Sequence, residues 1–320
     1  MSQDAGDLSR RQAIVAFGRS MPDRWNGLLL RVSALSERFG GKTESGVTIG
    51  ESAALAGLTS SSARERWSAA AALGRNSQRT PEALAALVGS LSDPEEFVRW
   101  QVVRALAAQE PGQVFPILSE LLDDPDPLRR SGAARALGQL GGEAAALTLS
   151  RRLDDPDPVA LAAIIEAMGE AGDPNMAATL LPFLEDPDSD VRRAAARSLG
   201  QLGNPGAGAA LASALTRPGQ SLLVRRAAAA ALVRVASPDA QPQLLSALSD
   251  ADPQVRAYAA HALGQVGSEQ ALVALGALKG DRTPVLRGTV GDAAREALAL
   301  LERRGRRGGE LHPGRMEDQV

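Results

Sequence analysis

Cysteine is absent from this chain of 320 residues, which excludes disulfides, thiolate nucleophiles and thiolate metal sites. The chain also lacks any apolar run near the roughly 18 residues that a membrane-spanning helix needs. Asp4 and Asp7 come before Arg10 and Arg11, and this order of charges is not that of a signal peptide. We therefore expect a cytoplasmic protein that has no membrane partner.

Aromatic residues, lysine and histidine are scarce. Aromatics make up 3% of the chain, and among its 35 basic residues only Lys42 and Lys279 are lysine. Alanine and leucine must then fill the core, which favours closely packed helices. The net charge of −3 argues against general nucleic-acid binding, although a local basic patch can differ from the total. The two histidines, His261 and His312, lack the spacing of metal ligands, so we expect no metal site. We also expect no cofactor and no catalytic residue.

What the chain does contain is one phrase that recurs eight times. The phrase is clearest from Asp186 to Gly203, and the same frame returns from Asp124 to Gly141 and from Asp155 to Gly172. An apolar residue near the end of each phrase serves as its anchor, and the anchors are spaced 31 to 35 residues apart: Leu73, Leu106, Leu137, Met168, Leu199, Leu232, Leu263 and Leu298. A fixed period in this range is typical of a stacked array whose units share their cores.

Each unit reads as two helices joined by an Asp-Pro turn. The second helix is predicted to begin after an N-cap aspartate: Asp126, Asp157, Asp188 or Asp252. Proline follows at the first helical position in three units, and glycine should end the helix in a left-handed conformation at Gly141, Gly172, Gly203 and Gly267. A further glycine directly follows the anchor, where it costs about 1 kcal/mol against alanine. Its recurrence at Gly138, Gly169, Gly200 and Gly264 predicts a tight helix crossing.

The phrase Asp-Pro, Val-Arg, Ala-Ala, Ala-Leu-Gly resembles the short HEAT-like repeat of the phycobilisome (bilin) lyase type. The resemblance implies an all-α fold, a right-handed α-solenoid of about eight helix pairs with an N-terminal helical cap. It also implies a ladder of hydrogen bonds between repeats, formed by the turn aspartate and the arginine seven positions before the anchor: Arg66, Arg99, Arg130, Arg192, Arg225 and Arg256. Leu161 and Gly291 occupy that position in the other two units, so the ladder should be interrupted there.

Three regions follow from this reading. Residues 1–47 are expected to form a helical cap, with helices at 8–19 and 23–39, followed by a glycine-rich linker. Residues 48–301 form the repeat array. Residues 302–320 begin with an arginine-rich run that is too polar to fold alone, so we expect a disordered tail.

Positions six and two before each anchor lie one helical turn apart, on the face that a solenoid of this kind presents on its concave side. Two tryptophans occupy equivalent places in adjacent repeats, and arginines follow them. Because tryptophan and arginine dominate interface hot spots, we predict that these residues bind a partner: Trp67, Phe97, Trp100, Arg104, Arg135, Arg193, Arg197 and Arg226.

The favoured function is a non-enzymatic scaffold that binds another protein carrying an acidic segment and an apolar anchor. One alternative is nucleic-acid binding, with the same arginines tracking phosphates across successive repeats. A second is a bilin-lyase-like subunit, in which the arginines pair with bilin propionates. Deoxyhypusine hydroxylase, which also has HEAT-like repeats, holds its di-iron centre with His-Glu pairs, and none occurs in this sequence.

Overall fold

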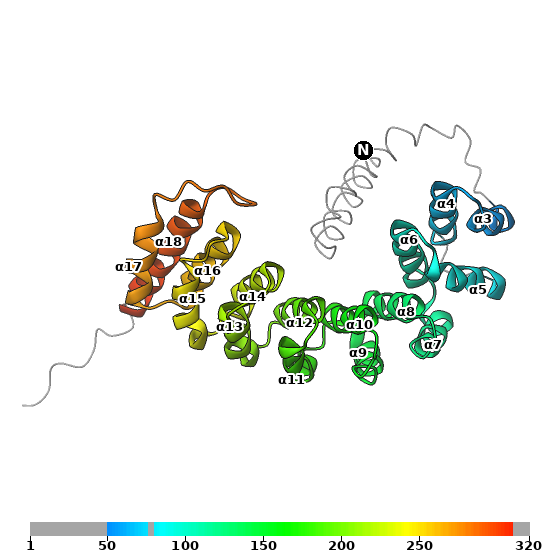
Figure 1. Ribbon diagram of the computed structural model, residues 1–320, viewed down its shortest axis with the longest axis horizontal. Helices are drawn as coiled ribbons and strands as arrows, with labels where there is room; N and C mark the ends of the chain where they lie inside the picture. Colours follow the sequence, from blue (N-terminus) through cyan, green and yellow to red (C-terminus); the bar gives the residue numbers. More distant parts are fainter. Residues whose placement is uncertain (1–49, 76–79, 310–320) are drawn as a thin grey trace, which may run out of the picture. The chain divides into compact units, whose positions relative to one another are not determined.

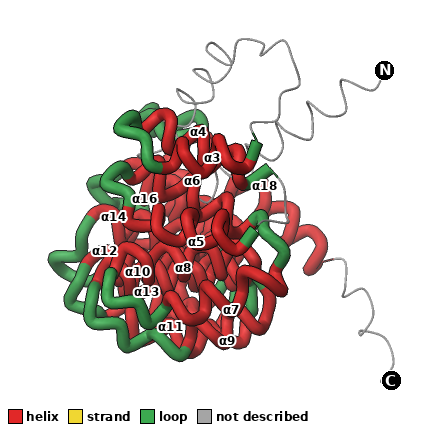
Figure 2. The backbone as a smooth tube through the Cα atoms, turned by 90° about the vertical axis from the view of Figure 1, so that its right-hand side faces the viewer, coloured by secondary structure: helices red, strands yellow, loops and turns green. Residues whose placement is uncertain are grey.

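The computed structural model describes residues 50–75 and 80–309, which contain helices, turns and loops but no named β-strand (Figure 2). The cap helices predicted at 8–19 and 23–39, and the linker after them, lie outside the described residues. The end of the chain after Gly309 also lies outside them.

The helices of the described part form eight consecutive pairs (Figure 1). The first helices are α3 (Glu51–Leu58), α5 (Pro81–Gly89), α7 (Pro111–Leu121), α9 (Gly142–Ser150), α11 (Ala177–Leu180), α13 (Gly208–Thr216), α15 (Gln241–Ala247) and α17 (Glu269–Leu278). The second helices are α4 (Ala63–Leu73), α6 (Glu96–Ala107), α8 (Pro127–Leu140), α10 (Pro158–Ala171), α12 (Ser189–Leu202), α14 (Leu222–Val235), α16 (Pro253–Val266) and α18 (Val290–Gly309). Short 3-10 helices extend several first helices: η1 (Ser90–Ser92), η2 (Pro174–Met176), η3 (Leu181–Glu185), η4 (Pro205–Ala207) and η5 (Pro238–Ala240).

Each second helix packs against the second helix of the next repeat, from α4 through to α18, so these helices form one continuous layer. All eight anchors lie in this layer and are buried. The period and the all-α solenoid predicted from the sequence are confirmed.

The helix ends follow the predicted capping residues with one exception. The side chains of Asp126, Asp157, Asp188 and Asp252 each accept a backbone N–H in the first turn of a second helix. Gly141, Gly172 and Gly203 have positive φ at the other end, as predicted. The prediction for Gly267 was wrong, because its φ is −66° and the chain leaves α16 in an extended conformation. In the preceding repeat Ala236 takes the left-handed conformation, although it is not a glycine.

Glycine directly after the anchor lets neighbouring second helices approach closely. A Cβ added to Gly138, Gly200 or Gly264 would lie 2.7–2.8 Å from the Cα of an alanine on the next helix. At Gly169 the same atom would lie 2.7 Å from the Cα of Ser198, whose hydroxyl donates to the carbonyl of Ile165 across the junction. The tight crossing predicted at these positions is confirmed.

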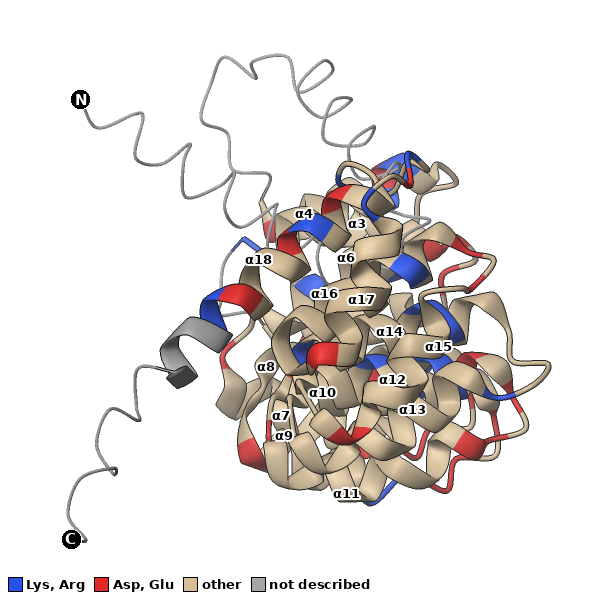
Figure 3. Ribbon diagram, turned by 90° about the vertical axis from the view of Figure 1, so that its left-hand side faces the viewer, with Lys and Arg blue, Asp and Glu red and all other residues tan. Residues whose placement is uncertain are grey.

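Arginines seven positions before the anchors join the turns of successive repeats. In Arg130, Nη1 donates to the Asp124 and Pro125 carbonyls of its own turn, 2.9 and 3.2 Å away. Its Nε and Nη2 reach the Asp155 carboxylate of the next turn, at 2.7 and 2.9 Å. Arg66 and Arg225 make the same two-nitrogen contact, to Asp93 and Asp250, and Arg256 reaches Asp281 through Nη2 alone. Figure 3 shows acidic residues in several of the loops that join the helices.

Three junctions differ from this arrangement. Arg99 donates to the Asp93 and Pro94 carbonyls of its own turn, and Ser92 bonds Asp126 across the junction to the next repeat. Leu161 replaces the arginine in α10 and is buried. In α12, Arg192 reaches the side-chain oxygen of Gln220 at 3.1 Å, so a neutral amide stands where other repeats have a carboxylate.

The last repeat has a long loop between its helices, and its second helix begins later than the sequence suggested. Gly288 lies before α18 with a positive φ. Thr289 and Asp292 then cap the helix reciprocally, and these bonds with the one from Arg295 lower the pKa of Asp292 to about 2. The helix continues to Gly309, so residues 302–309 of the expected tail are helical. The extension begins with Glu302, Arg303 and Arg304, which are good helix formers, and Arg304 bonds the Gln265 carbonyl of α16.

Replacing Gly200 by alanine should destabilise the array, because the added methyl group has no space beside Ala231. We expect the free energy of unfolding to fall by about 1–3 kcal/mol, which is the usual cost of overpacking. Gly276→Ala is the matched control, since Gly276 lies inside α17 and a Cβ there would meet nothing within 4 Å. This control should gain up to about 1 kcal/mol in urea unfolding. A Gly200→Ala protein as stable as the wild type would contradict the close crossing.

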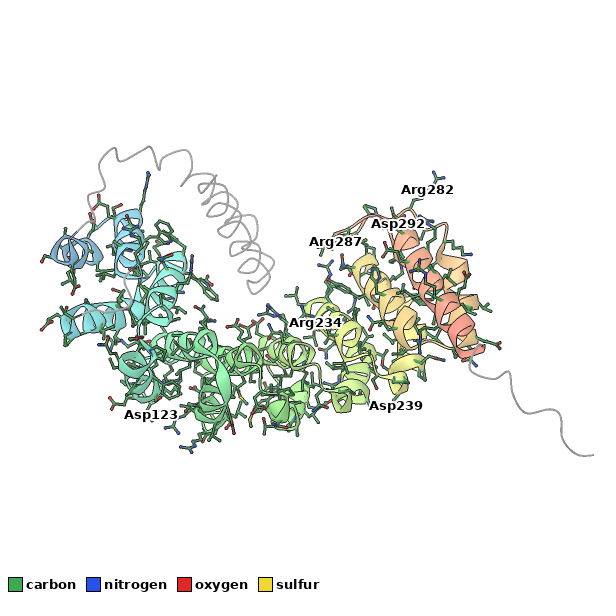
Figure 4. The ribbon with its side chains drawn as sticks, turned by 180° about the vertical axis from the view of Figure 1, so that it is seen from behind. Asp123, Arg234, Asp239, Arg282, Arg287 and Asp292 are labelled. Carbon is green, nitrogen blue, oxygen red and sulfur yellow. The ribbon has the colours of Figure 1, made fainter. Side chains whose placement is uncertain are left out.

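Replacing Arg130 by alanine should leave the Asp155 carboxylate unpaired in a side chain that is only 3% exposed. Breaking a buried ion pair on one side costs about 3–5 kcal/mol, so a fall of that order in unfolding free energy is expected. Arg282→Ala, in the exposed loop before α18 (Figure 4), serves as the control and should change stability by less than about 0.5 kcal/mol. Similar melting curves for the two variants would show that the ladder contributes little.

Candidate partner-binding surface

The positions six and two before each anchor form one face of the second-helix layer, which we call the wall. Its larger side chains are half-buried, apart from the exposed Arg104 and Glu296. Alanine or serine fills the six-before position in three repeats and is buried there. Arg234, two positions after an anchor, and Asp239, in η5 of a first-helix segment, lie on different sides of the helix row in Figure 4. The wall thus holds its charged and aromatic side chains on one side of the array.

The aromatic residues of the wall, Trp67 and Trp100, lie in α4 and α6, and Phe97 of α6 lies just outside the wall, nine positions before its anchor. Trp67 and Phe97 are half-buried and pack against the core cluster. Trp100 is half-buried as well, and the guanidinium carbon of Arg135, from α8, lies 5.1 Å from the centre of its ring. Trp100 therefore makes a cation–π contact with an arginine of the next repeat. The structure brings these two predicted residues together across the junction between repeats.

Burial changes the electrostatics of the two arginines beside Trp100. It lowers the pKa of Arg104 and, more deeply in the wall, that of Arg135. The charges of Glu166, Glu170 and Glu96 act on Arg135 in the opposite direction. Both guanidinium groups remain cations at neutral pH, since arginine titrates far above it.

The arginines predicted farther along the wall are paired with acidic residues of the chain. Arg193 lies 3.1 Å from Asp190 and 4.0 Å from Glu166, and Arg197 lies 3.7 Å from Glu166. Arg226 donates to both carboxylate oxygens of Asp252, at 2.6 and 2.9 Å, and this contact is the largest cause of the lowered pKa of Asp252. These arginines already have counter-charges within the structure.

Glu170 was missed by the sequence analysis. It lies in α10 two positions after the anchor, so it continues the row of Glu166 by one helical turn, and this four-residue step could have identified it. Burial, together with the negative charge of Glu166, raises the pKa of Glu170 to about 7, although Arg135 and Arg197 act against the shift. The carboxyl group of Glu170 therefore titrates near neutral pH beside the arginines of the wall.

Within residues 50–75 and 80–309, no group of three or more His, Cys, Asp or Glu side chains is arranged to hold a metal ion. The same residues contain no helix long and apolar enough to cross a membrane.

The profile of the HEAT repeats matches this chain in four overlapping stretches, residues 51–138, 98–160, 146–223 and 219–299. The chain belongs to the HEAT-repeat family. A comparison of this HEAT-repeat chain with curated proteins finds none that matches it.

Solved structures share the repeat architecture. YibA from Escherichia coli has a TM-score of 0.57 and 19% identity, over 77% of this chain and 88% of YibA. The complex of CpcE and CpcF of phycocyanin lyase from Nostoc sp. PCC7120 has a TM-score of 0.41 and 25% identity, over 82% of this chain and 97% of that chain. Human deoxyhypusine hydroxylase in complex with glycerol has a TM-score of 0.35 and 23% identity, over 82% of this chain and 98% of that chain. The likeness to YibA shows the fold alone, and the other two superpose too loosely to support a function.

Replacing Glu170 by glutamine should stabilise the protein in a pH-dependent way. Because the pKa of Glu170 rises from 4.5 to about 7 on folding, the folded state holds its proton more tightly. Stability then falls as the pH rises between these values and stays low above them. The variant avoids this loss, so its melting temperature should exceed that of the wild type by about 2–4 °C at pH 8, as about 1 kcal/mol gives in a chain of this size. The difference should shrink at pH 5. An equal difference at both pH values would contradict the shifted pKa.

Proposed function

We propose that this HEAT-repeat chain is a non-enzymatic scaffold that binds another protein along the wall. The partner is expected to carry an acidic segment and an apolar anchor. A solenoid presents such a surface already formed, so binding requires little ordering of the scaffold. The observation that supports this most is the cluster of Trp67, Trp100, Arg104 and Arg135 on three successive second helices, because tryptophan and arginine dominate interface hot spots.

The charges of the wall favour a protein over a nucleic acid as the partner. A continuous track of unpaired arginines would suit a phosphate backbone. Here Arg193, Arg197 and Arg226 are paired with acidic residues of the chain, which interrupts such a track. The partner surface therefore centres on the N-terminal part of the wall, with Trp67, Phe97 and Trp100 supplying its apolar area.

Affinity purification from the native organism, followed by mass spectrometry, tests the proposal. We expect a protein partner that is recovered with the wild type and is reduced about tenfold or more by Trp67→Ala/Trp100→Ala, since hot-spot truncation costs about 2 kcal/mol or more. Arg104→Glu reverses an exposed charge without opening the core and should reduce recovery as well.

A matched control removes apolar area elsewhere. Val273→Ala changes a side chain of α17 that is 79% exposed and lies outside the wall, so recovery should stay at the wild-type level. Melting curves of all variants separate loss of folding from loss of the surface. Identical partner lists for the wild type and the folded wall variants would rule out the wall as the binding surface, and recovery of nucleic acid in place of protein would overturn the scaffold.

A further inference from the structure

Arg135 is bound differently from the other half-buried arginines of the wall. Its Nε is buried and has no hydrogen-bond partner among the residues that the structure describes. Arg193, Arg197 and Arg226 each lie within 4.0 Å of a carboxylate, whereas Arg135 has a face-on contact with Trp100 as its nearest specific interaction. A guanidinium group with a buried, unsatisfied N–H is an uncommon feature in a folded protein.

The acidic residues around Arg135 do not replace a hydrogen-bonded partner. The negative charges of Glu166 and Glu170 in α10 and of Glu96 in α6 favour the charged form of Arg135. Arg99 and burial disfavour it, and burial has the largest effect, so the pKa of Arg135 is lowered. Glu166 lies at ion-pair distance from Arg193 and Arg197 of α12. A cation removed from water requires both charge and hydrogen bonds from its surroundings, and Arg135 receives only the first of these within the described chain.

The contact with Trp100 gives this unsatisfied group a defined orientation. A guanidinium over an indole ring keeps its plane fixed, and a planar, two-oxygen acceptor would meet Arg135 at its terminal Nη groups, since its Nε is buried. Arg104 follows Trp100 by one turn of α6 and adds a second cation, also in surroundings that disfavour charge. A guanidinium whose plane is fixed, with a second cation on the helix before it, suits a carboxylate, because a planar guanidinium matches the two oxygens of that group.

We propose that Arg135, held against Trp100, and Arg104 bind the carboxylate of an aspartate or glutamate side chain in an acidic segment of the partner protein. This inference rests on the proposed function and names the group that the wall recognises. A carboxylate fits better than a phosphate, because the single negative charge of a carboxylate is repelled less by Glu166 and Glu170 than the higher charge of a phosphate.

A binding titration with a defined probe tests the site. Acetylated, amidated hexaglutamate carrying a fluorescent label is titrated with the full-length chain at low salt, and its anisotropy gives the dissociation constant. Arg135→Gln keeps a shorter polar side chain but removes the charge, so affinity should fall about tenfold or more, as loss of a charge-assisted hydrogen bond predicts. Arg282→Gln is the matched control, since Arg282 lies exposed in the loop before α18 and outside the wall, and it should change affinity less than about twofold.

Two further variants keep the test decisive if Arg135→Gln folds poorly. Arg104→Gln changes an exposed side chain and should weaken binding several-fold. Arg135→Lys keeps the charge but loses the planar edge, so it too should bind more weakly than the wild type. Equal affinity of the wild type and the folded variants at Arg135 and Arg104 would overturn the site. Tighter binding of inorganic tripolyphosphate than of hexaglutamate would overturn the choice of a carboxylate.

The outcome is distinguishable from that of the scaffold experiment. Hexaglutamate binding that depends on Arg135, with no protein recovered from the native organism, would support the carboxylate site and contradict the scaffold. A partner that is lost with Trp67→Ala/Trp100→Ala but retained by Arg135→Gln would support the scaffold and contradict the carboxylate site.

Discussion

At several crossings, the spacing between successive second helices depends on a glycine that meets a small residue of the next helix. Gly138, Gly169, Gly200 and Gly264 stand so close to the next helix that a methyl group would contact its backbone. The glycine lies near the end of its helix, whereas the ladder arginine lies near the start, about two turns earlier. Two contacts at opposite ends fix both the separation and the tilt of neighbouring helices. The same spacing places each turn aspartate within reach of the preceding repeat, so the ladder depends on the crossing.

The junctions on either side of α12 show how the array is held where the ladder changes. Between α10 and α12, Leu161 cannot donate to a turn, and other contacts link the two helices: Ser198 bonds the Ile165 carbonyl, and Glu166 lies near two arginines of α12. Between α12 and α14, Gln220 accepts from Arg192 as a neutral amide, which makes a weaker bond than a carboxylate does. The amide nitrogen of Gln220 is itself buried without a partner. The middle of the array is thus joined by different and less strongly ionic contacts from those of its ends.

The sequence predicted the fold far better than the wall. Period, N-cap aspartates and crossing glycines are local or strictly repeated, so each could be identified from positions along one chain. Contacts across the wall depend instead on how side chains of adjacent helices meet. The six-before residue Trp100 meets the two-before Arg135 of the next repeat, whereas the six-before Arg226 turns to Asp252 at the start of the next helix. Equivalent positions in successive repeats do not show which of these two contacts an arginine will make. That contact decides whether the arginine has a counter-charge within the chain.

Arg192 and Arg193 are adjacent in the sequence, yet they make contacts on different sides of their helix, which equivalent positions alone do not predict. Successive residues of a helix point about 100° apart, so Arg192 enters the ladder while Arg193 reaches the wall. Around α10 and α12 the wall places Arg135, Arg193 and Arg197 near Glu166 and Glu170. Because the pKa of Glu170 is about 7, its carboxyl group is partly protonated at neutral pH. The carboxylates of Glu166 and Asp190 offset the charges of Arg193 and Arg197, so the net charge of −3 of the whole chain does not describe this part of the wall. Partner chemistry follows from this local balance, because screening at physiological salt limits charge effects to about 8 Å.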